Sequence, residues 1–252
     1  MRAVFASDVH LESDRDPFFS EFLRALEAQR ALGMTHLILV GDVLDVFLGA
    51  QPAFSLTYET FLKTLKRWMD SGLEVHWFEG NHDFQLDALT DQFASAKFFS
   101  YSKPAAMRFD ARSFFIAHGD EVDRSDYGYL LLRWVLRTPV VRFLSRVFPG
   151  SLVQRVGRVM NGPVQKNQVS ESDPRHVLIR DRFRRFARQR WDEGFDYVIL
   201  GHCHIFDDFR EQPPASSVPK QLVNCGYVKS DRKIFVWTPD QSWIEPVETS
   251  GL

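Results

Sequence analysis

Short hydrophobic runs alternate with longer amphipathic stretches through the first half of the chain. The runs Arg2–Ser7, Thr35–Val40 and Glu74–Phe78 have the length and composition of buried β-strands. Between them, Pro17–Leu32 is rich in Ala, Leu and Glu and predicts a helix, and a second helix is expected over Ser55–Ser71. This alternation is typical of an α/β protein whose helices cover the faces of a sheet.

The pattern changes in the second half of the chain. After two expected strands at Ala105–Asp110 and Arg112–Ala117, the sequence from Asp126 to Trp191 is almost wholly helical, apart from turn-forming pairs such as Pro149-Gly150. We interpret residues 121–191 as a helical cap inserted into a core that consists of residues 1–120 and 192–252. The expected strands after the cap are Tyr197–Leu200, Gln221–Asn224, Lys233–Thr238 and Trp243–Val247.

Polar motifs follow five of the expected strands. They are D-x-H at Asp8, G-D-x-x-D at Gly41, G-N-H-D at Gly80, H-G-D at His118 and G-H-x-H at Gly201. Because ligands bind beyond the carboxyl ends of strands in open α/β sheets, the five motifs are expected to meet at one site. Any one of them alone is more often a turn or a helix cap than a ligand. Five in this order, each at a strand end, are hard to explain as separate structural accidents.

The side chains in these motifs indicate a metal site. Carboxylate, imidazole and amide oxygen suit divalent ions such as Mn²⁺, Fe²⁺, Zn²⁺, Ni²⁺ or Mg²⁺, and no thiolate cage is present. Two ions about 3.5–4 Å apart stabilise both the attacking and the leaving oxygen of a displacement at phosphorus. We therefore predict two divalent metal ions, Mn²⁺ being the expected metal, that share a bridging carboxylate and activate a hydroxide nucleophile. The candidate ligands are Asp8, His10, Asp42, Asn81, His118, His202 and His204.

The ordered motifs, spanning residues 8–204, resemble those of the calcineurin-like metallophosphoesterase superfamily. The resemblance implies a four-layer α/β sandwich of mixed β-sheets flanked by helices, with a dinuclear metal centre at its edge. It assigns the first metal ion to Asp8, His10, Asp42 and His204, and it assigns a second ion, bridged by Asp42, to Asn81, His118 and His202.

The resemblance also gives roles to His82 and Asp83. It implies that His82, paired with Asp83, faces the phosphate and stabilises the transition state or protonates the leaving group. An imidazolium beside a carboxylate is a good proton donor near neutral pH, which makes this role chemically reasonable. Three other histidines, at positions 36, 76 and 176, fall outside the motifs, and we expect them to be structural.

The helical insertion narrows the resemblance to the bacterial UDP-2,3-diacylglucosamine pyrophosphohydrolases of lipid A synthesis. In that family the cap holds the acyl chains, and a D-x-G-Y element after H-G-D contacts the sugar; Asp126 and Tyr129 match this element. The resemblance therefore implies hydrolysis of UDP-2,3-diacylglucosamine to lipid X and UMP, with Asn81 and His82 touching the substrate. Lys166, in the loop that leaves the cap, is a further candidate phosphate contact.

Two alternatives remain open. The best-studied members of that family carry Arg where this chain has His82, so a phosphatase or phosphodiesterase acting on another lipid or nucleotide is the first alternative. The second is a non-catalytic scaffold on the same fold. Retention of every candidate ligand, together with His82, argues against the scaffold.

Composition sharpens this picture. With 44% hydrophobic and 25% charged residues and a net charge of −2, the 252-residue chain is neither disordered nor a disulfide-stapled miniprotein. The near-neutral balance hides a cap segment, residues 127–160, that contains six Arg and no acidic residue. Such a segment fits an anionic membrane surface or a phosphate-bearing lipid, although ordinary packing of the cap explains it equally well. No stacking platform for nucleic acid is recognisable, so no nucleic-acid partner is expected.

The expected location follows from the absence of sorting signals. Asp8 interrupts the N-terminal apolar run before it reaches signal-peptide length, and no apolar stretch approaches the roughly 20 residues of a membrane-spanning helix. Two cysteines are too few for a disulfide framework. We expect a cytoplasmic protein that is peripheral on the inner face of the cytoplasmic membrane.

Overall fold

The central strands of the molecule are apolar on both faces, and both faces are covered. The computed structural model describes residues 1–122, 138–148, 150, 173–213 and 218–250. In β2 (His36–Val40), Leu37 and Leu39 pack toward helices, whereas Ile38 and Val40 pack toward a second sheet. A strand buried on both sides needs a nearly continuous apolar sequence, which is why these runs stand out in the chain.

The first sheet has six strands in the order β13-β12-β1-β2-β4-β6. Strands β1, β2, β4 and β6 pair in parallel, and β12 and β13 add an antiparallel edge. Besides β2, the strands are β1 (Ala3–Ala6), β4 (Glu74–Phe78), β6 (Phe98–Tyr101), β12 (Lys233–Trp237) and β13 (Glu245–Glu248).

The second sheet has five strands in the order β10-β11-β9-β8-β7 and is also mixed. Its inner strands β8, β9 and β11 are parallel, and β7 and β10 are antiparallel to their neighbours. The strands are β7 (Ala105–Phe109), β8 (Arg112–Ile116), β9 (Tyr197–Leu200), β10 (Phe206–Glu211) and β11 (Lys220–Cys225). A small parallel pair, β3 (Phe47–Leu48) and β5 (Asp83–Phe84), lies apart from both sheets.

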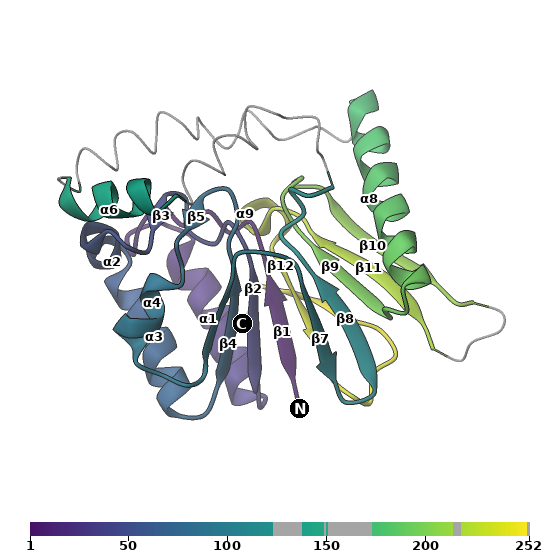
Figure 1. The fold of residues 1–252 in the computed structure, drawn as a ribbon. Coiled ribbons are helices and arrows are strands. Elements are labelled where there is room, and N and C mark those ends of the chain that lie inside the picture. Colours follow the sequence, from purple (N-terminus) through teal and green to yellow (C-terminus); the bar gives the residue numbers. More distant parts are fainter. Residues whose placement is uncertain (123–137, 149, 151–172, 214–217, 251–252) are drawn as a thin grey trace.

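Helices cover the outer face of each sheet (Figure 1). On the first sheet, Phe22 of α1 and Phe61 of α3 join a core with Trp77 of β4. On the second, Phe183 and Trp191 of α8 pack against β9 and β11. The described helices are α1 (Phe19–Ala31), α2 (Pro52–Thr57), α3 (Glu59–Asp70), α4 (Ala88–Phe93), α6 (Pro139–Val147), α8 (Pro174–Asp192) and α9 (Val228–Asp231).

A third core lies between the two sheets. Phe5 and Phe78 of the first sheet face Phe114 and Tyr197 of the second, and all four side chains are buried. Burial of one such aromatic side chain contributes about 2–3 kcal/mol, so this layer accounts for the close packing of the sheets. The order helix, sheet, sheet, helix confirms the four-layer mixed α/β sandwich expected from the sequence.

The structure changes some details of the expected elements. The single helix expected over residues 55–71 is two helices, because the chain departs from helical geometry at Tyr58, where α2 ends and α3 begins. Strands β6 and β10 were not predicted. The division into a core and a cap at residues 121–191 stays a prediction, and within that range α6 and α8 are the helices whose structure is described.

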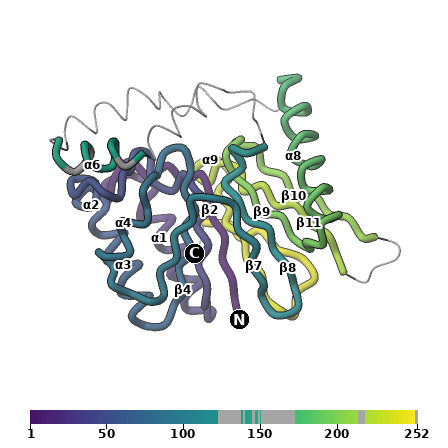
Figure 2. The backbone as a smooth tube through the Cα atoms, viewed as in Figure 1, coloured from purple at the N-terminus to yellow at the C-terminus, as the bar shows by residue number. Residues whose placement is uncertain are grey.

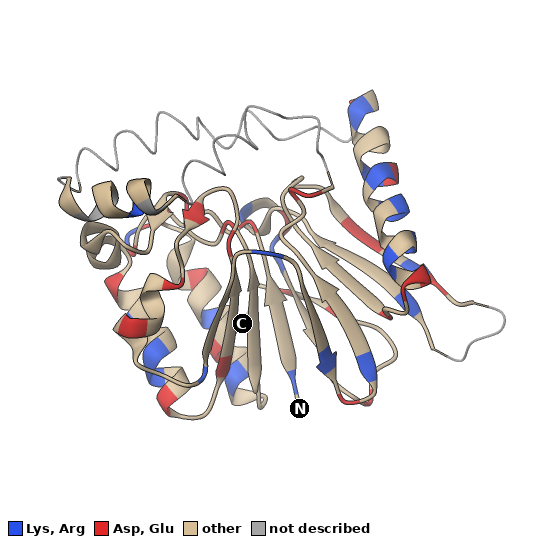
Figure 3. Cartoon of the chain, viewed as in Figure 1, with Lys and Arg blue, Asp and Glu red and all other residues tan. Residues whose placement is uncertain are grey.

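Helix α8 carries a row of arginines (Figure 3). Arg184 pairs with Asp207 and Arg188 with Glu211, both on β10, so this basic face is partly neutralised within the fold. Within the described ranges, no helix has the length and hydrophobicity needed to cross a membrane.

Candidate metal centre

The loops that carry the predicted ligands meet at one end of the two sheets, opposite the N-terminus (Figures 1 and 2). The backbone N–H of Asp8 donates to Gly41 O, and that of His202 donates to the Asp8 carboxylate. The loop after β1 is therefore bonded both to the loop after β2 and to the loop after β9. Strand ends from both sheets contribute, so the site lies at the edge between the sheets.

Five of the predicted ligands have unusual backbone conformations. Their φ angles are positive: 51° at Asp8, 47° at His10, 54° at Asp42, 73° at His202 and 55° at His204. A left-handed conformation costs a non-glycine residue about 1 kcal/mol or more. Such strain persists only where the surrounding structure imposes it, and its concentration at these positions indicates a functional constraint.

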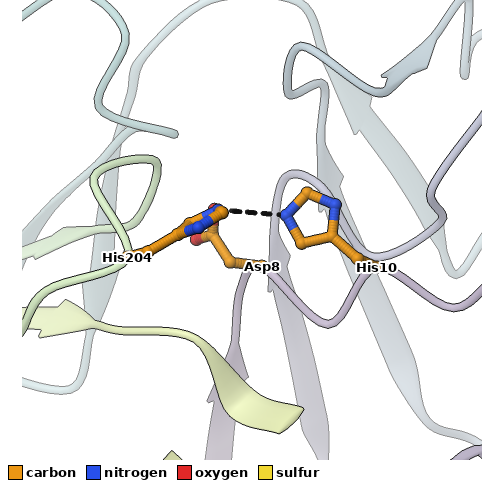
Figure 4. A group of neighbouring side chains, drawn as sticks. All are labelled: Asp8, His10 and His204. Atoms are coloured by element: carbon orange, nitrogen blue, oxygen red, sulfur yellow. Dashed lines mark hydrogen bonds and ion pairs between the residues drawn. The ribbon is translucent and has the colours of Figure 1, made fainter. Parts of the chain in front are cut away.

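The first cluster consists of Asp8, His10 and His204 (Figure 4). The Nε2 atoms of the two imidazoles lie 3.1 Å apart, and Asp8 Oδ1 lies 3.3 Å from His204 Nε2 and 3.9 Å from His10 Nε2. Asp8 and His10 come from the loop after β1, whereas His204 comes from the loop after β9. All three side chains are at least nine-tenths buried.

The second cluster consists of Asp42, Asn81, His118 and His202. His118 Nε2 lies 3.4 Å from Asp42 Oδ2 and 3.1 Å from Asn81 Oδ1, and His202 Nδ1 lies 2.9 Å from the same Asn81 oxygen. The Asp42 Oδ2 atom also lies 3.9 Å from His10 Nε2. Asp42 is therefore a carboxylate that both clusters share, and Asp8 of the first cluster also lies near Asp42 and His118.

Hydrogen bonds hold Asp42 in this orientation. Its Oδ1 accepts from the backbone N–H groups of Asn81, at 2.7 Å, and His82, at 2.8 Å, which leaves Oδ2 facing the imidazoles. The close approach requires glycine at position 80, because a Cβ there would lie 2.0 Å from Asp42 Oδ1. Such fixed outer contacts are typical of carboxylates that bind metal ions.

The two buried carboxylates of the site, Asp8 and Asp42, favour binding of a cation. Burial acts to raise the pKa values of Asp8 and Asp42, but the surrounding histidines outweigh it, holding the pKa of Asp8 below its ordinary value and that of Asp42 well below. Among the described residues, no Lys or Arg pairs with either carboxylate. Asp42 instead holds the pKa of His118 well above its ordinary value, although burial opposes this. The proton on His118 balances negative charge at a position where a metal cation would do the same.

The donor set fits divalent metal ions. Burial lowers the pKa of His10 to about 3, so its imidazole is neutral and offers a lone pair. Buried carboxylates without a Lys or Arg partner are otherwise costly, and carboxylate, imidazole and amide donors are the combination that borderline divalent cations prefer. These residues could hold two such ions, one at each cluster.

The expected pairing of His82 with Asp83 is wrong. His82 Nδ1 lies 2.6 Å from the carbonyl oxygen of Asp45 and 3.5 Å from its carboxylate, and the imidazole packs edge-on against His10 with ring centroids 4.5 Å apart. Burial acts to lower the pKa of His82, but Asp42 and Asp45 together raise it to about 9. Asp45 is thus the partner that sequence reasoning missed, although it is the second aspartate of G-D-x-x-D.

Asp83 has a different position. Its buried carboxylate accepts from four N–H groups: those of Asp42 at 3.0 Å, Val43 at 3.0 Å and Gly80 at 2.8 Å, and the indole of Trp77 at 3.1 Å. These groups belong to β4 and to the loops after β2 and β4, which carry Asp42 and Asn81. Asp83 therefore ties two ligand-bearing loops together.

Two further residues border the first cluster. Tyr227 stacks on His204 with ring centroids 5.1 Å apart, and Lys229 Nζ donates to the carbonyl oxygen of His10 at 2.7 Å. Both lie after β11, outside every motif, so no sequence pattern pointed to them. The predicted substrate contacts Asp126, Tyr129 and Lys166 lie outside the described residues.

Buried carboxylates and imidazoles at the strand ends of a four-layer α/β sandwich define a class of metal-dependent hydrolases. The family model described as calcineurin-like phosphoesterase matches residues 1–206, and the chain belongs to this family. It is therefore a phosphohydrolase of a family that uses divalent metal ions.

Curated relatives agree with this assignment. The chain is 27% identical over 201 residues to a UDP-2,3-diacylglucosamine hydrolase of Pseudomonas syringae pv. tomato, covering 80% of this chain and 78% of the relative. It is 29% identical over 207 residues, with the same coverage, to a UDP-2,3-diacylglucosamine hydrolase of Pseudomonas fluorescens. Among solved structures, a phosphoesterase from E. coli aligns over 99% of this chain and 100% of its own with a TM-score of 0.44 and 17% identity.

Proposed function

We propose that this protein hydrolyses the pyrophosphate bond of UDP-2,3-diacylglucosamine and releases UMP and the acylated sugar phosphate, lipid X. The observation that carries the chemistry is the pair of clusters joined by Asp42, since a shared carboxylate between two cation sites suits hydrolysis at phosphorus. The relatives named as hydrolases of this substrate support its identity, because the similarity covers 80% of the chain.

The proposal assigns the ligands by cluster. Asp8, His10, Asp42 and His204 would hold one ion, and Asp42, Asn81, His118 and His202 the other, with Mn²⁺ as the proposed metal. When bound, the ions supply positive charge to the phosphate oxygens and activate a water molecule. The protein's part is to hold its ligands rigidly through the backbone bonds to Asp8 and Asp42.

His82 is the proposed proton donor. Attack of water on phosphorus breaks the bond to the leaving oxygen, which then needs a proton. Asp45 holds the Nδ1 side of the imidazole, and its nearby carboxylate favours the protonated form of the ring. In this scheme Asp83 is a positioning residue, because its contacts are to the ligand-bearing loops.

The exposed face of α6 supports a lipid substrate. Val140, Phe143 and Val147 are each about two-thirds exposed, which is unusual for three apolar residues on one short helix. The helix packs beside the amino-terminal ends of α2 and α4, since Arg142 pairs with Asp87 and Gln51 Nε2 donates to Phe148 O. We propose that this face receives acyl chains and places the protein at an anionic membrane surface. Sugar contacts by Asp126 and Tyr129, and a phosphate contact by Lys166, belong to the same proposal.

The direct test is product analysis. Purified protein incubated with Mn²⁺ and UDP-2,3-diacylglucosamine is expected to release UMP, measured by chromatography, and a chelator is expected to stop the reaction. Bis-p-nitrophenyl phosphate serves as a substrate without a lipid. Hydrolysis of the simple ester without UMP release would assign the protein to another phospholipid or nucleotide substrate. Inactivity on every phosphoester would favour the scaffold.

The Asp45→Asn variant is expected to lose activity at a lower pH than the wild type. Asp45 helps to raise the pKa of His82, and protonated His82 is lost as the pH rises through that pKa. Removal of the Asp45 carboxylate lowers the pKa of His82, so the fall of kcat/KM at alkaline pH begins closer to neutral pH. A His82→Gln control should lack this alkaline limb and lose about 10²-fold in rate. If the alkaline limb of the Asp45→Asn profile lay at the same pH as that of the wild type, Asp45 would have no role in setting the pKa of the proton donor.

The Phe143→Ser variant is expected to raise KM for UDP-2,3-diacylglucosamine by about ten- to a hundredfold, because loss of one aromatic contact with an acyl chain weakens binding by about 1.5–3 kcal/mol. Its kcat/KM for bis-p-nitrophenyl phosphate should not change. Leu32→Ser is the matched control, since Leu32 is also about two-thirds exposed but follows α1 at the opposite end of the molecule. Equal effects of the two substitutions would contradict a role of α6 in lipid binding.

A further inference from the structure

A separate group of potential ligands lies at the amino-terminal ends of β2 and β4, at the opposite end of these strands from the metal centre. It consists of His36, Glu74 and His76. Glu74 Oε2 lies 3.4 Å from His36 Nε2 and 4.0 Å from His76 Nε2. The group shares no residue with either cluster of the metal centre, so its role is independent of the proposed function.

The sheet register places the three side chains on one face. His36 is paired with Glu74 across β2 and β4, and Ile38 is paired with His76, so the side chains at these positions project to the same side. That side faces the second sheet, where Phe109 meets the His36 ring edge-on at 5.3 Å between centroids. The His76 ring stacks on Phe99 at 4.8 Å. Packing therefore fixes both imidazoles before any ligand binds.

Hydrogen bonds direct one nitrogen of each imidazole toward Glu74. His36 Nδ1 lies 2.9 Å from the Thr35 hydroxyl, and His76 Nδ1 lies 3.0 Å from the Tyr101 hydroxyl. When each Nδ1–H donates to its hydroxyl oxygen, both Nε2 atoms carry lone pairs that face Glu74 Oε2. This outer arrangement, in which the second ring nitrogen is hydrogen-bonded, is typical of histidines that bind metal ions.

The remaining atoms of the group leave room for a cation. Lys97 Nζ donates to Glu74 Oε1 at 2.6 Å, which leaves Oε2 directed at the imidazoles. His76 Nε2 is buried and makes no hydrogen bond, an arrangement that is costly unless something binds there. Burial lowers the pKa of His36, and it lowers the pKa of His76 to about 4, so both rings are neutral at physiological pH.

We propose that His36, Glu74 and His76 form an additional binding site for a borderline divalent cation, Zn²⁺ above all. Zn²⁺ binds imidazole nitrogen and carboxylate oxygen at about 2.0–2.2 Å in tetrahedral geometry, which places neighbouring ligand atoms about 3.3 Å apart. The three ligand atoms all lie within 4.8 Å of one another, with separations of 3.4 and 4.0 Å from Glu74 Oε2, so side-chain movement must bring them closer when an ion binds. Glu74 is about one-third exposed, so water can supply the fourth ligand. A bound ion would join β2 to β4 at the end of the sheet far from the metal centre.

The first test is metal content. Protein freed of metal by chelation and dialysed against micromolar Zn²⁺ is expected to retain one more ion per chain in the wild type than in Glu74→Gln or His36→Gln. His176→Gln is the matched control, because His176 lies on α8 and belongs to none of the metal-binding groups found among the described residues. Near-ultraviolet circular dichroism verifies that each variant is folded. Equal Zn²⁺ content in wild type and folded variants would overturn the proposal.

A second test needs no substitution. Diethyl pyrocarbonate modifies accessible neutral imidazoles, and modified histidines are identified by mass spectrometry. Zn²⁺ is expected to reduce modification of His36 at least fivefold in the wild-type protein, while modification of His176 stays the same. Unchanged modification of His36 at a Zn²⁺ concentration that saturates the metal centre would rule the site out.

Discussion

An Asp42→Asn variant is expected to lose at least three orders of magnitude in kcat/KM for phosphodiester hydrolysis. Asp42 is the carboxylate shared by the two clusters, with Oδ2 3.4 Å from His118 and 3.9 Å from His10. Asparagine keeps the size of the side chain but removes the negative charge that two cations would share, so both sites weaken together. The amide can also present its NH₂ group to the backbone donors of Asn81 and His82, which disturbs the orientation of the side chain.

Activity on bis-p-nitrophenyl phosphate and Mn²⁺ content by elemental analysis measure this effect together. Asp207→Asn is the matched control, because Asp207 is also a buried carboxylate but pairs with Arg184 on the far side of the second sheet. That variant should keep its activity and its metal. If Asp42→Asn retained more than a tenth of the wild-type rate, a shared bridging carboxylate would be excluded.

An Asp83→Ala variant is expected to lose about 4 kcal/mol in the free energy of unfolding. The substitution leaves four buried N–H groups without an acceptor, and each unsatisfied donor costs about 1–3 kcal/mol before partial relaxation. Urea denaturation followed by fluorescence measures the change. The surface substitution Asp91→Ala on α4 should change stability by less than about 0.5 kcal/mol.

The Asp83→Ala variant also tests whether Asp83 positions the ligand-bearing loops or takes part directly in the reaction. If Asp83 acts by holding the loops after β2 and β4, folded Asp83→Ala protein should bind Mn²⁺ more weakly, and excess metal should restore part of the rate. A full loss of rate with unchanged metal affinity and stability would contradict the positioning role. It would return Asp83 to the catalytic role that the family resemblance implied.

Much of the fold was predictable because buried strands need apolar side chains on both faces. The apolar runs at residues 36–40, 74–78 and 197–200 predict buried strands, and β2, β4 and β9 lie there. Strand β10 escaped prediction because its sequence, FDDFRE, is mostly polar, and it forms only by pairing with β11. The helix break at Tyr58, where the backbone has φ −117° and ψ 30°, left no mark in the hydrophobic pattern.

The candidate site was predictable at the level of its ligands but not of their partners. Strand ends collect at one edge of an α/β sheet, so the order of the motifs was sufficient to bring Asp8, Asp42 and His118 together. The partner of His82 depends on how two loops lie against each other, and Asp45, 37 residues away, was a nearer neighbour in space than Asp83 beside it. The histidines at positions 36 and 76 were expected to be structural because they lie outside the motifs. Glu74 and His76 share a face of one strand, but the approach of His36 to them depends on the register of β2 and β4.

The sequence by itself determined most of the strands, the candidate donor atoms and the class of chemistry, because these depend on local hydrophobic periodicity and on the identity of side chains after each strand. The tertiary structure alone decided which strands join each of the two sheets, that Asp83 ties two ligand-bearing loops together, and that Asp45 rather than Asp83 contacts His82. Periodicity states that a side chain is buried but not what it is buried against. Distances of 3–4 Å between residues far apart in the chain are set by the packing of the sheets and by the paths of the loops, which no local pattern encodes.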